Sequence, residues 1–350
     1  MKRWAAALLA VTSLASGTPV PDAQEIHALP PALRAQVQAG LQQQGALPAR
    51  ERLDWLIRFV FSPQGLGLHY DDHRTRTVAE AVADRKANCV SFTLLFMALA
   101  QEAGLPAKAQ EYDQVLMLYP QGDLIYTARH MNVRVRAGLR GYSVDIDRHA
   151  LVARDAARPV SLGRVLAHYY NNRGMELMAA GDLAAARAHL DQALAQDPRY
   201  VPAWNNLGVL LLRSGDAAQA EAAYLSALVL APEHTATLFN LAGLYAQNGD
   251  ASRQAAFQRR LQQAQAQDPT QQFLLGVERE RLGDHAGAIP HYRRALRHFG
   301  NVHQLHFHLA RAYRLAGEPR RAAHALQRAW QLGDDAARAR YRTLLDELGY

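Results

Sequence analysis

The sequence predicts an α+β domain followed by an all-α solenoid of helical repeats. Beyond residue 161 small residues recur every 34 positions, which is the period of stacked helix pairs. Before that point, an apolar run at 92–100 precedes two alternating segments, as expected for a helix packed on antiparallel strands. A chain of 350 residues, 49% hydrophobic and 20% charged, has room for roughly two folded domains.

The first residues have the pattern of an export signal. Lys2 and Arg3 precede a short apolar stretch at 4–14, and small residues suited to cleavage follow. We therefore expect residues 1–17 to be a signal peptide and the protein to be periplasmic or secreted. No cysteine lies near the cleavage site, and no later stretch has the roughly 18 uninterrupted apolar residues of a membrane span. We expect no transmembrane segment in the mature protein.

The formal net charge of +7 raises the question of a nucleic-acid partner. Nearly all basic residues are arginines, and they are spread among acidic residues with no run of five or more. No basic stripe with interleaved aromatic residues is present, so we expect no nucleic-acid binding. A nucleic-acid binder would instead show a steep dependence of binding on salt.

Cys89 is the only cysteine in the chain. It follows a polar, basic stretch at 83–87 and opens the apolar run, which ends at a glycine and a proline at 104–106. This predicts Cys89 at the first turn of a buried helix, where unpaired backbone N–H groups and the helix dipole favour a thiolate. An inert core cysteine is the alternative. A lone thiol in an oxidising compartment, however, normally has a function or is fully buried.

Downstream of this helix the pattern predicts a small antiparallel sheet. Residues 107–118 and 129–137 read as strands, 138–141 as a turn and 142–146 as the return strand of a hairpin. His130 opens the first hairpin strand and Asp145 lies in the return strand, so the two can be neighbours. A nucleophilic Cys89 needs such a base and such an orienting partner.

Three segments together resemble the bacterial transglutaminase-like family. These are Asn88-Cys89-Val90-Ser91-Phe92 continuing to Gly104-Leu105-Pro106-Ala107, then Arg129-His130-Met131-Asn132-Val133, and finally Tyr142-Ser143-Val144-Asp145. The resemblance covers about 77–147 and implies a transglutaminase-like, papain-like fold over residues 24–155. It also implies Cys89 as nucleophile, His130 as base and Asp145 as its orienter. The expected reaction is acyl transfer or hydrolysis on a peptide or carboxamide, without a cofactor.

The sequence departs from that family at two positions and leaves one choice open. Asn132 and Tyr142 stand where the family often has tryptophan, and Asp147 competes with Asp145 for the third position. Papain-like proteases place the histidine about 130–150 residues after the cysteine, whereas here the separation is 130 − 89 = 41. Small cell-wall endopeptidases have a comparable separation, but their cysteine normally follows an aspartate, which here is Asn88.

The second half of the chain resembles the tetratricopeptide repeat. Glycines at the predicted helix-to-helix turns accompany the small residues, and we expect five repeats over 161–336 and a capping helix over 337–350. Pro269 falls three residues later than its counterparts, which predicts a distorted second helix in the third repeat. The recurrent small residues are Gly174, Gly208, Ala242, Gly276 and Ala310.

The repeats predict a protein or peptide partner. Asn172, Asn206 and Asn240 share one repeat position and could grip the backbone of an extended peptide. Three nearby histidines do not have the spacing of a helical metal-binding pair, so no metal site is expected; they are His303, His306 and His308. The alternative to the enzyme is a non-catalytic periplasmic adaptor whose repeats mediate protein–protein interaction.

Overall fold

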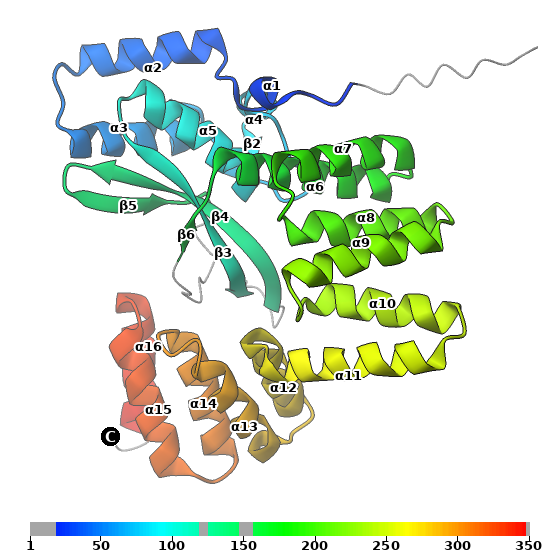
Figure 1. Cartoon of the computed structure of the whole chain (residues 1–350). Coiled ribbons are helices and arrows are strands. Elements are labelled where there is room, and N and C mark those ends of the chain that lie inside the picture. The colour runs from blue at the N-terminus through cyan, green and yellow to red at the C-terminus, as the bar shows by residue number, and fades with distance from the viewer. Residues whose placement is uncertain (1–18, 119–124, 147–156, 348–350) are drawn as a thin grey trace, which may run out of the picture.

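The computed structural model describes residues 19–118, 125–146 and 157–347 (Figure 1). The predicted signal peptide at 1–17 lies outside the described residues, as does Asp147. Five helices precede the main sheet in the described part of the chain. They are α1 (Ala23–His27), α2 (Pro31–Gln43), α3 (Ala49–Phe61), α4 (Val78–Asp84) and α5 (Cys89–Glu102).

A four-stranded antiparallel sheet follows, in the spatial order β5-β4-β3-β6. A separate parallel pair of two-residue strands, β1 and β2, lies just before α5. The predicted hairpin is present, although its second strand begins two residues earlier than the pattern indicates. The strands are β1 (His69–Tyr70), β2 (Lys86–Ala87), β3 (Ala107–Leu118), β4 (Ile125–Ala137), β5 (Arg140–Val144) and β6 (Arg158–Pro159).

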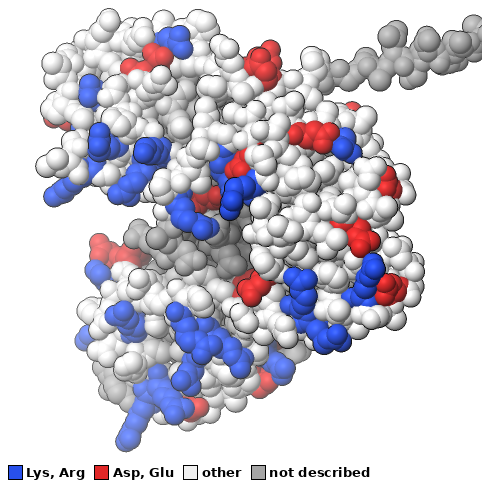
Figure 2. All heavy atoms as spheres, viewed as in Figure 1, with Lys and Arg blue, Asp and Glu red and all other residues white. Residues whose placement is uncertain are grey.

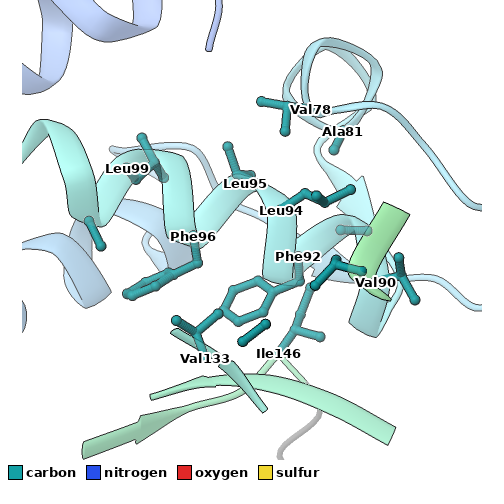
Figure 3. Packing of buried hydrophobic residues seen from close by; sticks show 14 of the residues in the cluster. Val78, Ala81, Val90, Phe92, Leu94, Leu95, Phe96, Leu99, Val133 and Ile146 are labelled. Atoms are coloured by element: carbon teal, nitrogen blue, oxygen red, sulfur yellow. The ribbon is translucent and has the colours of Figure 1, made fainter. Parts of the chain in front are cut away.

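Helix α5 packs on one face of this sheet and supplies most of its apolar cover. Phe92 and Phe96 are fully buried, with ring centroids 5.4 Å apart, and they lie over Val133 and Ile146 (Figure 3). Burying a side chain of this size contributes roughly 2 to 3 kcal/mol relative to exposure. The layer of helix on sheet is the α+β arrangement that the sequence predicts.

Ten helices between residues 162 and 332 form five successive pairs, and α16 (Asp335–Glu347) follows them within the described residues. In Figure 1 the pairs form an arc, and the sheet lies on the inner side of this arc. The pairs are α6 (Leu162–Ala179) with α7 (Leu183–Gln196), α8 (Val201–Arg213) with α9 (Ala217–Leu230), α10 (Thr235–Gln247) with α11 (Ala251–Gln267), α12 (Pro269–Arg281) with α13 (His285–Leu296), and α14 (His303–Leu315) with α15 (Pro319–Leu332).

The third pair differs from the expectation. Helix α11 is continuous and longer than α7 and α9, with 17 residues against 14. It continues to Gln267, and Asp268 alone joins it to α12. Asp268 ends one helix and caps the next, since its carboxylate accepts the N–H groups of Thr270 and Gln271 at 2.8 and 3.1 Å. The late proline is then the first residue of α12, a position where its missing N–H costs nothing.

The core does not divide at the predicted boundary near residue 160. Val165, Tyr169 and Tyr170 of α6, and Tyr200 at the start of α8, belong to the same buried cluster as Phe92 of α5. The first repeat therefore packs against the N-terminal domain and shares its hydrophobic core. Among the described residues, the helices are all too short or too polar to cross a membrane.

Candidate active site

Cys89 is the first residue of α5, and the start of this helix is held on two sides. Asn88 caps it by accepting the N–H of Ser91 at 2.9 Å, and its amide donates to Thr75 at 2.7 Å. The Ser91 hydroxyl accepts the N–H of Arg76 at 2.7 Å and donates to its carbonyl at 2.8 Å. These bonds fix the helix terminus, so Cys89 has a defined position. Its thiol is half-buried and forms no disulfide.

The structure brings His130 between Cys89 and Asp145. Nε2 of His130 lies 2.6 Å from Oδ2 of Asp145, and the Cys89 thiol is close enough to the imidazole to raise its pKa. Because Nε2 faces the carboxylate, Nδ1 is the ring nitrogen left for the thiol. His130 is 1% exposed and Asp145 is 21% exposed at the side chain. The three residues that the sequence singles out therefore meet in the order thiol, imidazole, carboxylate.

The charged form of the imidazole is favoured at this place. Burial lowers the pKa of His130, but the hydrogen bonds with Asp145 and Cys89 outweigh it and raise the pKa from 6.5 to about 10. A partner that retains a positive charge next to a thiol stabilises the thiolate. The imidazole of His130 therefore carries a positive charge beside the Cys89 sulfur at neutral pH.

Two residues that the sequence did not assign to the site complete its hydrogen bonding. Asn132 donates to Oδ2 of Asp145 at 3.2 Å and lies 3.3 Å from the hydroxyl of Tyr112. Both are buried. Strand alternation is the signal that could have found Asn132, since it lies two residues after His130 and so on the same face of β4. It gives the Asp145 carboxylate a second donor besides His130.

The first repeat is attached to this site by buried polar contacts. The carboxylate of Glu176, on α6, accepts the N–H of Thr75 at 2.7 Å, and Thr75 in turn holds the Asn88 cap. On β3, Glu111 lies 3.1 Å from Nε2 of His168, whose Nδ1 is 3.0 Å from the Tyr200 hydroxyl. The repeats thus support the loop in front of α5 as well as the sheet.

One group of side chains in the described residues has the spacing of a metal site. Asp71, Asp72 and His73 bring ligand atoms within 4.8 Å of one another in the loop before α4. Asp71 also forms a 2.8 Å ion pair with Arg76, and His73 is largely exposed. These residues lie in a solvated turn, and the Asp71 carboxylate already has Arg76 as its cationic partner.

The asparagines of the repeats form a chain of side-chain hydrogen bonds between neighbouring pairs. Asn206 donates to Asn171 at 2.8 Å, and Asn240 donates to Asn205 at 3.0 Å. Asn172 is half-exposed and shares a 3.5 Å contact with Asn171. The side-chain amides of Asn206 and Asn240 therefore form hydrogen bonds between neighbouring repeats.

The three histidines of the fifth repeat take part in packing. His303 lies 2.9 Å from the hydroxyl of Tyr341, and His306 lies 3.0 Å from the carbonyl of Gly300. His308 packs edge-on against Phe273. The three histidines therefore make separate contacts and do not converge on one shared position.

Comparison with known proteins identifies the second half of the chain. The tetratricopeptide repeat family matches residues 171–234, 210–269 and 273–340. Residues 171–340 thus carry tetratricopeptide repeats, and the five helix pairs have the form expected of them. The match starts at residue 171 and bears only on the repeats. A comparison with curated proteins finds no match.

Solved structures of repeat proteins are similar to this region. The MamA protein is 17% identical and covers 48% of this chain and 91% of its own, with a TM-score of 0.27. MamA from Desulfovibrio magneticus RS-1 is 17% identical, and the match covers 47% of this chain and 94% of the MamA chain, also with a TM-score of 0.27. YrrB, described as a TPR protein with an unusual peptide-binding site, is 16% identical and covers 51% and 92%, with a TM-score of 0.27. At such TM-scores we take the repeat assignment from the family match and the helix pairs.

Proposed function

We propose that this protein is a transglutaminase-like cysteine enzyme that performs acyl transfer or hydrolysis on a peptide or carboxamide substrate. The observation that carries the proposal is the contact of His130 with both Cys89 and Asp145. A half-buried thiol at a capped helix terminus, beside a retained positive charge, is an arrangement suited to nucleophilic attack. The signal-peptide pattern of residues 1–17 supports a periplasmic or secreted location in this proposal.

The reaction follows from the order of the three residues. The thiolate of Cys89 attacks the carbonyl carbon and forms an S–C bond, and the C–N bond breaks as His130 gives its proton to the leaving amine or ammonia. Water or a second amine then attacks the thioester, loses a proton to His130 and releases the thiol. Asp145 holds the imidazole in position throughout. Backbone N–H groups at the start of a helix have no partner within the helix, so those of α5 can donate hydrogen bonds to the oxyanion that forms during the attack.

The repeats have a separate role in this proposal. Tetratricopeptide repeats support a function in protein–protein interaction, and here they would present a protein or peptide partner to the enzyme. Asn172, half-exposed on α6, is the member of the predicted asparagine set with an amide not bonded to the neighbouring repeat. The second candidate function is a non-catalytic adaptor, which the repeat family match favours by itself.

We expect Cys89 to react with iodoacetamide almost as fast at pH 6 as at pH 8. The raised pKa of His130, about 10, keeps a positive imidazolium beside the Cys89 sulfur over this whole range, and such a charge favours the thiolate. In a His130→Ala variant the rate should fall about a hundredfold from pH 8 to pH 6, as it does for an ordinary thiol. Mass spectrometry of the intact protein measures both rates.

His189→Ala is the matched control, because His189 is also a buried histidine but lies on α7, bonded to the carbonyl of Ala185. Its alkylation profile should equal that of the native protein. Cys89→Ala should take up no label and keep its helical circular dichroism. A slow native reaction that His130 does not affect would instead favour the adaptor.

A further inference from the structure

The face of the sheet that carries His130 continues into a row of cations. Side chains alternate along β4, so one set is buried under the body of α5, whereas the other set lies on the opposite face of the strand. Beyond Asn132 this second set becomes exposed and basic. The buried set is Met131, Val133 and Val135, and the other set is His130, Asn132, Arg134 and Arg136.

A hollow of about 790 Å³ lies on this face. Lys108, Arg134 and Arg136 line it, together with the polar Gln110 and the apolar Leu139 and Pro159. We call this hollow the basic groove. None of the described residues that line it is acidic. Figure 2 shows Lys and Arg side chains over the part of the surface where Figure 1 places β4, β5 and β6.

The cations of the basic groove are exposed and close together. Lys108 lies directly opposite Arg134 in the antiparallel register. A side chain at Gly141 would have its Cβ 2.7 Å from the Arg134 guanidinium, so this glycine leaves room for it. Within the described residues, none of the three cations has a carboxylate within ion-pair distance. Their charge is therefore available to a ligand.

The basic groove is aligned with the candidate active site. A strand advances about 3.4 Å per residue, so Arg134 and Arg136 lie about 14 and 20 Å along β4 from His130. The floor between them is polar, since Asn132 binds Asp145 and the Ser143 hydroxyl lies 3.4 Å from Gln110. An extended peptide with its reactive carbonyl at Cys89 would reach this groove within about four to six residues.

We infer that the basic groove binds the acidic part of a peptide substrate, in which Asp or Glu residues alternate with other residues. The inference rests on the proposed function and specifies its substrate class. Arg134 and Arg136 repeat at the two-residue spacing of β4, which is also the spacing of side chains on one face of an extended peptide. The fully exposed Leu139 at the rim can contact an apolar side chain between the acidic ones.

The test uses two hexapeptides that carry a vinyl sulfone as the electrophile for Cys89. One has glutamate at alternate positions and the other has glutamine there. We expect the glutamate peptide to label Cys89 about tenfold faster at low salt, because several exposed ion pairs add modest contributions. High salt should remove the preference, since it screens exposed charges. Intact-protein mass spectrometry measures the second-order rates.

The charge-reversal variant Arg134→Glu/Arg136→Glu should lose the preference for the glutamate peptide while its rate with iodoacetamide stays the same. Arg140→Glu is the matched control, because Arg140 is an exposed arginine of the same hairpin, paired with Ala137 and thus on the opposite face. It should keep the preference. An equal loss in this control would overturn the assignment of the groove.

A second readout separates this inference from the proposed function. Fluorescence anisotropy of the labelled glutamate peptide, without an electrophile, measures binding to the full-length Cys89→Ala variant. Tighter binding than the glutamine peptide, lost in Arg134→Glu/Arg136→Glu, supports the groove even if iodoacetamide shows an unactivated thiol. Equal binding of the two peptides overturns it. Tighter binding of an oligothymidylate or of phosphatidylglycerol vesicles, dependent on the same arginines, also overturns the peptide assignment.

Discussion

Single residues decide how closely the helices of each pair approach. Gly276 of α12 lies against the ring of Tyr292 on α13, and a Cβ at Gly276 would be 2.5 Å from this ring. Gly208 of α8 has the same relation to Tyr224 of α9, two pairs earlier in the chain. In the third pair the position holds Ala242, and the residue sixteen further on is the exposed Gln258. In the second and fourth pairs, glycine thus occurs where a tyrosine fills the space between the two helices.

Gly276→Ala should lower the free energy of unfolding by about 1 to 2 kcal/mol. Overpacking against the buried Tyr292 costs about 1 to 3 kcal/mol, and the better helix propensity of alanine offsets about 1 kcal/mol of this. Urea unfolding followed by far-ultraviolet circular dichroism measures the difference.

Gly243→Ala is the control for this substitution. Gly243 lies in the middle of α10 with no atom within 4 Å of its added Cβ, so alanine should stabilise the protein by up to about 1 kcal/mol. Destabilisation by both substitutions would show that the tyrosine contact is not the cause.

At the scale of the elements, the solenoid is not uniform. Helix α11 buries only Ala264, and the apolar cluster that ends there is distinct from the one that begins at Phe273 of α12. The fourth and fifth pairs share this second cluster, and they are also linked by an ion pair whose carboxylate is buried. Glu280 of α12 accepts two bonds from Arg311 of α14, at 2.8 and 2.9 Å, and one from the Tyr292 hydroxyl at 2.6 Å.

This ion pair should make the C-terminal repeats sensitive to acid. Burial raises the pKa of Glu280, but hydrogen bonds from His308, Arg311 and Tyr292 outweigh it and lower the pKa from 4.5 to about 2. The folded state therefore binds the proton less tightly than the unfolded state. The stability that Glu280 contributes is complete above pH 4.5 and disappears as the pH falls through this range towards 2.

We expect Glu280→Gln to lower the stability by about 2 kcal/mol at pH 7, because it removes the buried carboxylate charge that accepts two hydrogen bonds from Arg311. The difference from the native protein should shrink between pH 4.5 and pH 3, and thermal unfolding at several pH values measures it. Glu278→Gln removes an exposed pair with Arg281 on the same helix and should change little at any pH. A difference for Glu280→Gln that does not depend on pH would contradict the ion-pair account.

At the scale of the whole molecule, the N-terminal domain and the first repeat share one core. Tyr170 of α6 donates to the carbonyl of Pro21 at 2.7 Å, across 149 residues of sequence. Tyr200, at the start of α8, is buried in the core that contains α5. Removal of the repeats would expose this core and the support of the site loop.

A chain that ends at residue 160 should therefore aggregate or lose its near-ultraviolet circular dichroism. A chain that ends at residue 233 keeps the first two helix pairs and should retain both the tertiary signal and the alkylation rate of Cys89. Size-exclusion chromatography and iodoacetamide labelling of the two chains test this. A well-folded, reactive chain ending at 160 would show that the two halves are independent.

Much of this architecture could be predicted from local patterns in the sequence. The 34-residue period identifies the helix pairs because each pair needs the same small residues at its contact, as Gly276 illustrates. The alternation of Met131, Val133 and Val135 identifies β4, and the order of Cys89, His130 and Asp145 indicates their meeting because a hairpin must bring its two ends together. These features depend on residues near in sequence or on one turn.

The features that depend on contacts between residues far apart in the sequence were decided by the tertiary structure. The union of the first repeat with the N-terminal domain arises from Glu111, Glu176 and Tyr200, which carry no periodic signal. The extension of α11 depends on Asp268 capping two helices at once. The pairing of Asn132 with Asp145, and the gathering of Lys108 with Arg134 into one groove, follow from strand register. Such register is set by packing of the whole sheet rather than by any one segment.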